Sequence, residues 1–232
     1  METRRKKPAF KGVKSVAPLI GRALDRARVR LGVDERRAQL LELGLSIFGS
    51  TNYDAISIDD IAERAGMSKG LLYHYFVSKR GFYVAVVRHA AAKLAEQFVF
   101  DPGLPPEARA RRGLELYLDF VSDRAEAYTA LMRSGVGSDP EVLEILESTR
   151  DVAVGVILHT IGVKEERPLL RLAFRSWVGA VEAAALSWLD RREIDKGTLV
   201  ELLWRLLVQT GIEALRLDPV PGLNPNLLKN SS

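Results

Sequence analysis

The sequence predicts an all-α protein in which a group of short helices is followed by a set of longer ones. Apolar residues recur at helical spacing in nearly every segment, and no segment shows the sustained alternation that indicates a β-strand. Capping residues and glycines divide the first part of the chain into short helices. The stretch DPGLPP, residues 101–106, separates the two groups because its prolines and glycine interrupt regular structure.

Composition excludes several kinds of chemistry. The chain of 232 residues has no cysteine, and its three histidines, His74, His89 and His159, form no metal-binding pair in the sequence. We therefore expect no metal and no cofactor. No apolar run has the length that a bilayer requires, and the basic start METRRKK lacks the apolar segment of a secretory signal. These features are typical of a cytoplasmic protein.

Positive charge is concentrated at the N-terminal end. The net charge of the chain is +4, yet residues 1–37 hold twelve Lys and Arg against four Asp and Glu, a local charge of +8. This distribution indicates contact with a polyanion, although a solubilising tail would have the same composition. Residues 1–33 also hold three glycines and two prolines. We expect a mostly flexible basic arm there, with a short helix within residues 16–27.

Three short helices are expected after the arm. Arg36–Ser50 has its apolar residues on one face. Ser57, with Asp60 three residues later, is a capping-box start for a two-turn helix that Gly66 ends. Ser68 caps a third helix, and a longer helix follows over about residues 80–98. The inward residues of the third helix are expected to be Leu71, Leu72 and Phe76.

The second and third helices have the spacing of a helix-turn-helix, with a small residue, a turn glycine and an aliphatic anchor at Ala62, Gly66 and Leu72. The outward side of the third helix has few of the charged residues usual on a solvated helix. It carries Ser68, Lys69, Gly70, Tyr73 and His74. Such a helix fits the major groove with its first residues at base edges, and Tyr73, His74 and Lys79 suit phosphate oxygens. Tyr73 and Tyr75 could instead cover the edge of the core, which is the interpretation that we favour for Tyr75.

Residues 36–87 resemble the DNA-binding domain of TetR-type transcriptional regulators, and the stretch IAERAGMSKGLLYHYFVSK carries the resemblance most specifically. The resemblance implies an all-helical homodimer that binds double-stranded operator DNA through an N-terminal three-helix domain. It further implies a C-terminal helical domain that binds an effector and forms the dimer. The implied DNA contacts are Ser57 and Lys79 at backbone phosphates, with Ser68, Lys69, Gly70, Tyr73 and His74 on the recognition helix.

Arg80 departs from the acidic residues that commonly follow the conserved lysine in this family. A cation at the start of a helix opposes the helix dipole. We therefore expect a DNA phosphate to hold Arg80 there, and a solvated Arg80 is the alternative. In the arm, Arg4, Arg5, Lys6 and Lys7, or Arg28 and Arg30, are expected to contact phosphates or the minor groove.

Beyond the break, helices are expected at roughly residues 106–123, 125–134, 139–161, 167–190 and 195–217. One helix has a face of small residues at Gly179, Ala180, Ala183, Ala184 and Ser187. The last helix offers large residues instead, namely Leu203, Leu206, Leu207 and Leu215 with Trp204. Close packing of two such helices from each of two chains would make a four-helix interface. An ordinary core within one chain would explain the same pattern, and the family resemblance favours the dimer.

An effector pocket is expected among the middle helices, where apolar bulk accompanies a few polar groups. The candidates are Tyr117, Phe120, Tyr128, Met132, His159, Phe174, Trp177 and Glu182. Taken singly, a residue of this kind is more often part of an ordinary core. The segment DERRAQLL and the basic arm are similar to those of family members that respond to long-chain acyl-CoA, which suggests an elongated apolar tunnel.

We thus expect four regions: a basic arm at 1–33, a helix-turn-helix domain at 34–80, an effector and dimerisation domain at 81–217, and an extended tail at 218–232. The predicted function is a sequence-specific regulator, a repressor that a small hydrophobic effector releases, with an effector-dependent activator as the alternative. An all-helical enzyme would need a pair such as His159 and Glu182. A membrane-surface binder would use residues 4–30, whereas the main interpretation includes no membrane.

Overall fold

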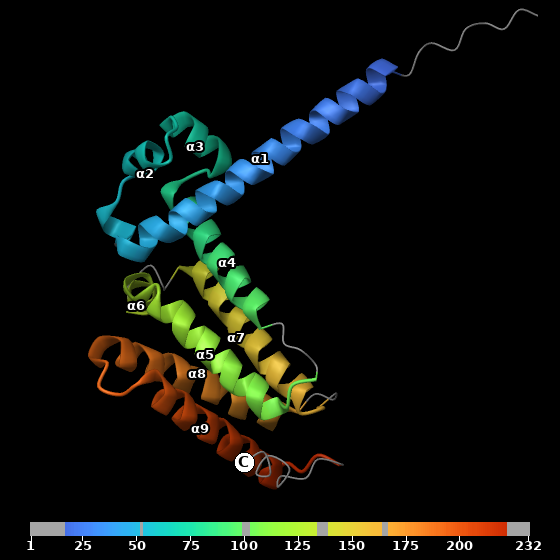
Figure 1. Ribbon diagram of the computed structural model, residues 1–232, viewed down its shortest axis with the longest axis vertical. Helices are drawn as coiled ribbons and strands as arrows, with labels where there is room; N and C mark the ends of the chain where they lie inside the picture. Colours follow the sequence, from blue (N-terminus) through green and yellow to red (C-terminus); the bar gives the residue numbers. More distant parts are fainter. Residues whose placement is uncertain (1–16, 52, 99–102, 134–138, 164–166, 222–232) are drawn as a thin grey trace, which may run out of the picture. The chain divides into compact units, whose positions relative to one another are not determined.

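The computed structural model describes residues 17–221 except 52, 99–102, 134–138 and 164–166, and for residues 17–31 it describes only the backbone. The chain forms two units, residues 1–40 and 41–232. Every regular element in the described part is helical, which confirms the predicted all-α class (Figure 1). Residues 1–16 and 222–232 lie outside the described residues. The arm charges that were predicted to contact DNA or lipid lie there or, like Arg28 and Arg30, on residues whose side chains are not described.

The first helix is longer than the sequence predicted. α1 runs without interruption over Ala17–Ser50, whereas we expected it to begin near Arg36 after a mostly flexible arm. The earlier part is rich in Ala, Leu and Arg, which have high helix propensity. Its two glycines, Gly21 and Gly32, each cost about 1 kcal/mol in a helix, and that cost is too small to end one. The glycines and prolines of this segment were therefore weaker evidence against a helix than we assumed.

The end of α1, residues 41–50, packs with two short helices. A 3₁₀ turn at Tyr53–Ala55 leads into α2 (Ile58–Arg64), which begins with the predicted capping box between Ser57 and Asp60. The backbone N–H and the hydroxyl of Ser57 donate to Asp60 at 2.8 and 2.7 Å, and the Asp60 N–H donates to Ser57 Oγ at 3.1 Å. Gly66 then ends the helix with a φ of +63°, a conformation that glycine adopts without strain.

α3 (Lys69–Tyr75) begins at the Ser68 cap, whose hydroxyl accepts from the Leu71 N–H at 3.2 Å. Leu72 and Phe76 are buried as predicted, whereas Leu71 is 44% exposed. The prediction for Leu71 was wrong because a helix of seven residues has room for only a narrow inward stripe. Leu72 and Phe76, four residues apart, already occupy it.

α4 (Lys79–Gln97) follows directly and is enclosed by protein along its first half. Its residues Phe82 to Val87 are all buried, and the ring of Phe82 packs against those of Phe48 and Phe76 at centroid distances of 5.9 and 4.8 Å. Gly44 of α1 faces this point. A Cβ at Gly44 would lie 2.8 Å from Phe82 Cζ and would collide with Val86, so the two helices meet closely only because the side chain is absent.

The remaining helices match the prediction closely. They are α5 (Pro106–Ser122), α6 (Ala125–Arg133), α7 (Pro140–Thr160), α8 (Pro168–Arg191) and α9 (Lys196–Leu217). Two apolar clusters hold them together. The first centres on Leu118 and Leu203 and joins α5, α8 and α9, and the second centres on Val154, Leu170 and Phe174 and joins α7, α8 and α9.

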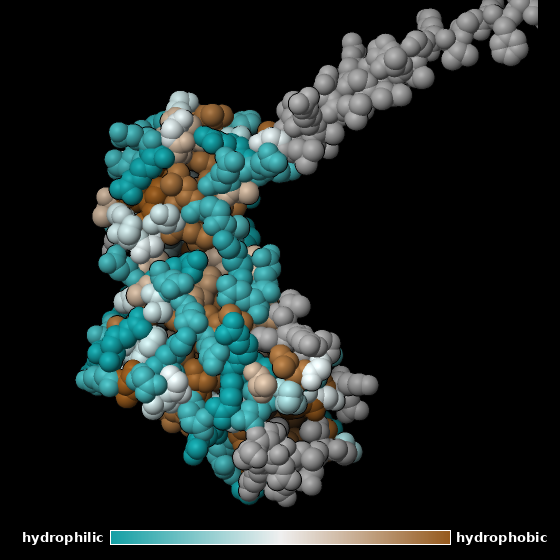
Figure 2. Space-filling model, viewed as in Figure 1, coloured by the Kyte–Doolittle hydropathy of each residue, from teal (hydrophilic) through white to brown (hydrophobic). Residues whose placement is uncertain are grey.

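On the face drawn in Figure 2, hydrophilic residues form most of the surface, and hydrophobic residues appear between them in smaller patches. None of the described helices combines the length and apolar character that a bilayer crossing would require. Many apolar residues of these helices instead pack into the two clusters and into the core around the first half of α4.

Substituting Gly44→Ala should lower the free energy of unfolding by about 1–3 kcal/mol, because the new methyl group has to displace Phe82 or Val86 from a packed core. Chemical denaturation measures the change. Gly49→Ala is the matched control on the same helix, since a Cβ there meets nothing within 4 Å. That variant should be neutral or more stable by up to about 1 kcal/mol. Equal stability changes in the two variants would contradict the close contact.

Candidate nucleic-acid interface and cavity

The outward side of α3 is accessible as the sequence predicted. Ser68, Lys69, Gly70, Tyr73 and His74 are all exposed. Gly70 has no packing partner in its own chain, because an added Cβ would meet nothing within 4 Å. A glycine inside a helix costs stability, and here no close contact within the protein compensates for it. The surface therefore has room for another molecule to approach the α3 backbone closely.

Neighbouring groups already engage the cations near α3. Lys69 donates to Asp59 of α2 at 2.8 Å, and both side chains are about half exposed or more. This contact raises the pKa of Lys69 and connects its side chain to the first turn of α2. Lys79 is half-buried, with its Nζ 4.2 Å from the centre of the Tyr53 ring. Such exposed contacts contribute little stability, so a phosphate could replace them at small cost.

Arg80 has a different partner from the one we expected. Its Nε and Nη2 donate to Asp139 at 2.5 and 2.8 Å, and its Nη1 donates to Glu141 at 2.8 Å. Asp139 is also the N-cap of α7, because it accepts from the Glu141 N–H at 3.0 Å. Arg80 lowers the pKa of Asp139 through these bonds. In the folded chain, two carboxylates at the start of α7 balance this cation.

A cavity of about 570 Å³ lies among α4, α5, α7, α8 and α9. Its volume falls within the usual range for small-molecule sites. Apolar side chains from all five helices form most of the wall, among them Leu94, Phe98, Leu114, Ile145, Phe174 and Leu207. The lining follows α7 from Glu144 to Ile161, which corresponds to about 25 Å of helix. The cavity is therefore elongated.

Four of the eight predicted pocket residues line this cavity, namely Tyr117, Phe174, Trp177 and Glu182. Phe120 and Tyr128 instead pack against the first apolar cluster, and Met132 lies half-buried on α6, which contributes no residue to the wall. His159 is exposed on α7, although its neighbour Thr160 lines the cavity. One residue corresponds to a rotation of about 100° around a helix, so the sequence placed His159 on the wrong side.

Several polar groups of the wall are occupied by partners within the chain. The hydroxyls of Tyr117 and Tyr128 are 2.6 Å apart, and Trp177 Nε1 donates to the Leu203 carbonyl at 3.0 Å. Burial raises the pKa of Tyr117 well above its ordinary value and that of Tyr128 to about 12. Thr149 donates to the Ile145 carbonyl at 2.8 Å. These groups shape the cavity and remain neutral.

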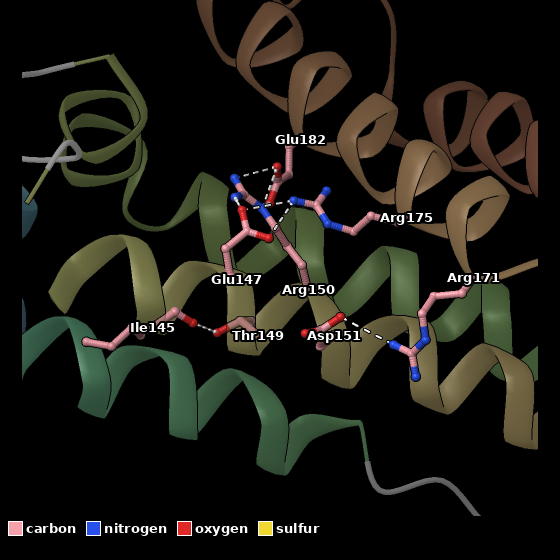
Figure 3. Close-up of polar contacts among 8 residues, drawn as sticks. All are labelled: Ile145, Glu147, Thr149, Arg150, Asp151, Arg171, Arg175 and Glu182. Carbon is pink, nitrogen blue, oxygen red and sulfur yellow. Dashed lines mark hydrogen bonds and ion pairs between the residues drawn. The ribbon is translucent and has the colours of Figure 1, made fainter. Parts of the chain in front are cut away.

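A charged network connects α7 and α8, and two of its members, Arg150 and Glu182, line the cavity (Figure 3). Arg150 of α7 donates hydrogen bonds from its Nε and Nη2 to the carboxylate of Glu182 on α8, at 2.8 to 3.1 Å. Its Nη1 donates to Glu147 at 2.6 Å. Arg175 of α8 also donates to Glu147, at 2.9 and 3.0 Å. The arginines, first Arg175 and then Arg150, lower the pKa of Glu147. Because Glu182 is held in this way, it serves as a structural part of the wall.

His159 and Glu182, the pair that an all-helical enzyme would have needed, do not lie together. Glu182 is bound to Arg150, whereas His159 lies nine residues further along α7, about 13 Å along the helix axis, and is exposed. The two groups therefore share no acid–base site in this structure.

Sequence reasoning missed three cationic members of the wall, Arg150 of the network just described, Arg88 of α4 and Arg109 of α5. Arg88 is exposed, whereas Arg109 is half-buried and its Nε is fully enclosed. A signal for Arg109 was present in the sequence. It is in phase with the apolar stripe of Ala110, Gly113, Leu114 and Tyr117, where a charged residue is unusual.

Comparisons with known proteins agree with this architecture. Residues 40–86 match the model of bacterial regulatory proteins of the tetR family, and residues 106–210 match the tetracyclin repressor-like C-terminal domain. The transcriptional activator FasR of Mycolicibacterium smegmatis is 30% identical over 179 residues, which cover 74% of this chain and 81% of FasR.

Solved structures show the same fold. A tetR-family regulator from Streptomyces coelicolor is 35% identical, with a TM-score of 0.73 and coverage of 80% of this chain and 84% of that one. FadR of Bacillus subtilis, solved in complex with stearoyl-CoA, is 18% identical, with a TM-score of 0.61 and coverage of 75% and 98%. Together with the exposed α3 and its helix-turn-helix, these matches show that the chain belongs to the TetR family of DNA-binding transcriptional regulators.

Proposed function

We propose that the protein binds operator DNA through α3 and releases it when an elongated apolar effector fills the cavity. The observation that carries this proposal is the course of α4. Its first half, around Phe82, is buried in the core that seats α2 and α3. Its second half contributes Leu94 and Phe98 to the cavity. One helix therefore connects the proposed reading surface with the proposed effector site.

The proposed roles on DNA follow from exposure and chemistry. Tyr73 and His74 lie where a helix in the major groove would present them to the duplex, and Gly70 would allow close approach. Lys69 would leave Asp59 for DNA, and Lys79 together with the Ser57 region would contact phosphates. Arg80 has no such role in this proposal, because its two carboxylate partners hold it at α7.

The proposed effector is a molecule with a long apolar chain, such as a long-chain acyl compound. The support is the elongated, mainly apolar wall of the cavity. FadR of Bacillus subtilis, which has the same fold, was solved in complex with stearoyl-CoA, a compound of this class. We propose release from DNA, hence repression, as the default mode. FasR is named an activator, and the position of an operator relative to its promoter decides the sign of regulation.

We also propose that two copies associate through α8 and α9. On α8, Ala180, Ala183 and Ser187 are exposed small residues, as the predicted interface requires. On α9, Leu202 and Leu206 are 50% and 43% exposed. Of the four leucines that the sequence assigned to this face, Leu206 is therefore exposed, whereas Leu203, Leu207 and Leu215 are buried within the chain. Leu202 was not among them. Two recognition helices spaced about 34 Å apart would read successive major grooves.

Replacing Tyr73 or His74 with Ala should reduce preference for a selected operator over random DNA by about 10- to 100-fold where the side chain reads a base edge, because a base contact contributes about 1–3 kcal/mol of discrimination. A contact to phosphate would instead lower affinity for both DNAs alike. The operator is obtained by selection from random duplexes, and fluorescence anisotropy measures affinity. His159→Ala is the matched control, because this exposed histidine lies on α7, outside α2 and α3. An unchanged preference in both α3 variants would remove the recognition assignment.

Replacing both Leu202 and Leu206 with Glu should shift the protein from dimer to monomer, because four charges would have to be buried at the proposed interface. Light scattering after size-exclusion chromatography measures the mass. Leu143→Glu on α7 is the control, since Leu143 is exposed to a similar degree at 42%. A double variant with the same mass as the parent protein would place the dimer interface elsewhere.

A long-chain acyl-CoA should bind and weaken affinity for the selected operator by about 5- to 150-fold, the usual range of coupling between two sites. Acetyl-CoA should have no such effect because it lacks the apolar chain. Ala153→Phe, which would place a ring in the cavity, should retain DNA binding and lose the response. If neither acyl compounds nor other long-chain apolar molecules bind to the parent protein, the effector proposal is wrong.

A further inference from the structure

One residue of the cavity wall, Arg109, has a buried side-chain nitrogen that nothing in the chain satisfies. Among the buried side-chain nitrogen and oxygen atoms of the described residues, Arg109 Nε is the one without a hydrogen-bond partner. The polar groups of Thr149, Trp177 and Glu182 around the same wall are all bonded. A buried donor left unpaired destabilises a protein, and native structures rarely contain one. The arrangement would be explained if a ligand supplied the missing acceptor.

Arg109 has a defined position along the cavity. It lies in the first turn of α5, which follows shortly after Phe98 at the end of α4. Ala110, beside it, packs against the second apolar cluster, which contains Val154 of α7 and Phe174 of α8. Tyr117, eight residues later, packs against the first cluster, about 12 Å further along α5. The guanidinium thus occupies one end of an apolar passage.

The other charged residues of the wall do not offer the same site. Arg150 is held by Glu182 and Glu147. Arg88 is exposed, so water can solvate it at no cost. Arg109 alone among these three combines an enclosed, unpaired N–H with a permanent positive charge. A guanidinium recognises an oxygen anion more strongly than any neutral group does.

We propose that Arg109 anchors the anionic end of the effector, which makes the effector an amphiphile with a long apolar chain and an oxygen anion at one end. This inference rests on the proposed effector site and adds the class of its ligand and the direction in which that ligand lies. The anion contacts Arg109, and the apolar chain extends toward Tyr117. Neutral lipids of the same length fill the passage and leave the guanidinium unpaired.

The test compares three ligands of one chain length: tetradecanoate, tetradecanol and tetradecanoyl-CoA. Calorimetry or displacement of a fluorescent fatty acid measures their affinities, at concentrations below micelle formation. The parent protein should bind tetradecanoate about 10- to 100-fold more tightly than the alcohol, as expected for a hydrogen bond to a charged group. Arg109→Met should bind both equally, because it retains the apolar length and lacks the donor. Arg109→Lys should retain part of the preference through its charge.

Arg112→Met is the matched control on the same helix. Arg112 is exposed, donates to Glu115 and does not line the cavity, so its loss should leave the preference for the acid intact. Without ligand, Arg109→Met should melt at the same or a higher temperature than the parent, because an unpaired donor has been removed. This second measurement separates loss of the anion site from loss of the fold.

The outcomes distinguish the inference from the proposed function. Equal affinity of the parent for acid and alcohol, or an acid preference that survives in Arg109→Met, overturns the role of Arg109 and leaves the apolar site standing. Failure of all three ligands to bind the parent overturns the effector site itself. A loss of affinity in Arg109→Met that tetradecanoate shows and tetradecanoyl-CoA does not identifies a free carboxylate as the anion, whereas a loss that both ligands show means that the phosphates of CoA can take the same place.

Discussion

The enclosure of α4 is the constraint on which the rest of the structure depends. Successive residues of a helix are 100° apart, so the buried run from Phe82 to Val87 covers the whole circumference. The core around it contains Phe48 and Phe76, and Gly44 lacks the side chain that would push α4 away. Packed cores resist gradual deformation and tend to switch between discrete arrangements. A displacement at the cavity end of α4 would therefore reach α2 and α3 as the movement of a rigid element.

The contact of Arg80 with Asp139 and Glu141 gives α4 a second fixed point. These side chains are partly exposed, so the bonds contribute little to stability. Their value is geometric, because a planar guanidinium between two carboxylates sets the start of α4 against the start of α7. Both helices also line the cavity further along. A ligand that moves α4 and α7 apart would strain the contact of Arg80 with its two carboxylates. This contact would thereby connect the proposed effector site physically with α2 and α3.

Much of the DNA-binding surface was predictable because its signals are local. The capping box at Ser57, the cap at Ser68 and the glycine at residue 66 depend on neighbours three residues away or fewer. The cavity was predicted only in part, since a lining residue is defined by helices far apart in sequence. Phe174 and Trp177 followed from bulk and polarity, whereas Phe120 and Tyr128 share these properties and lie in the core.

The sequence by itself determined the all-α class, the bounds of most helices and the exposed face of α3, because helix periodicity and capping depend on residues only a few positions apart. Only the tertiary structure decided that Arg80 belongs to α7 and that Glu182 is held by Arg150. Those outcomes depend on which partners are brought within 3 Å by packing over 30 to 60 residues of separation. The buried Nε of Arg109 belongs to the same class, since enclosure is a property of five helices together and not of the residue.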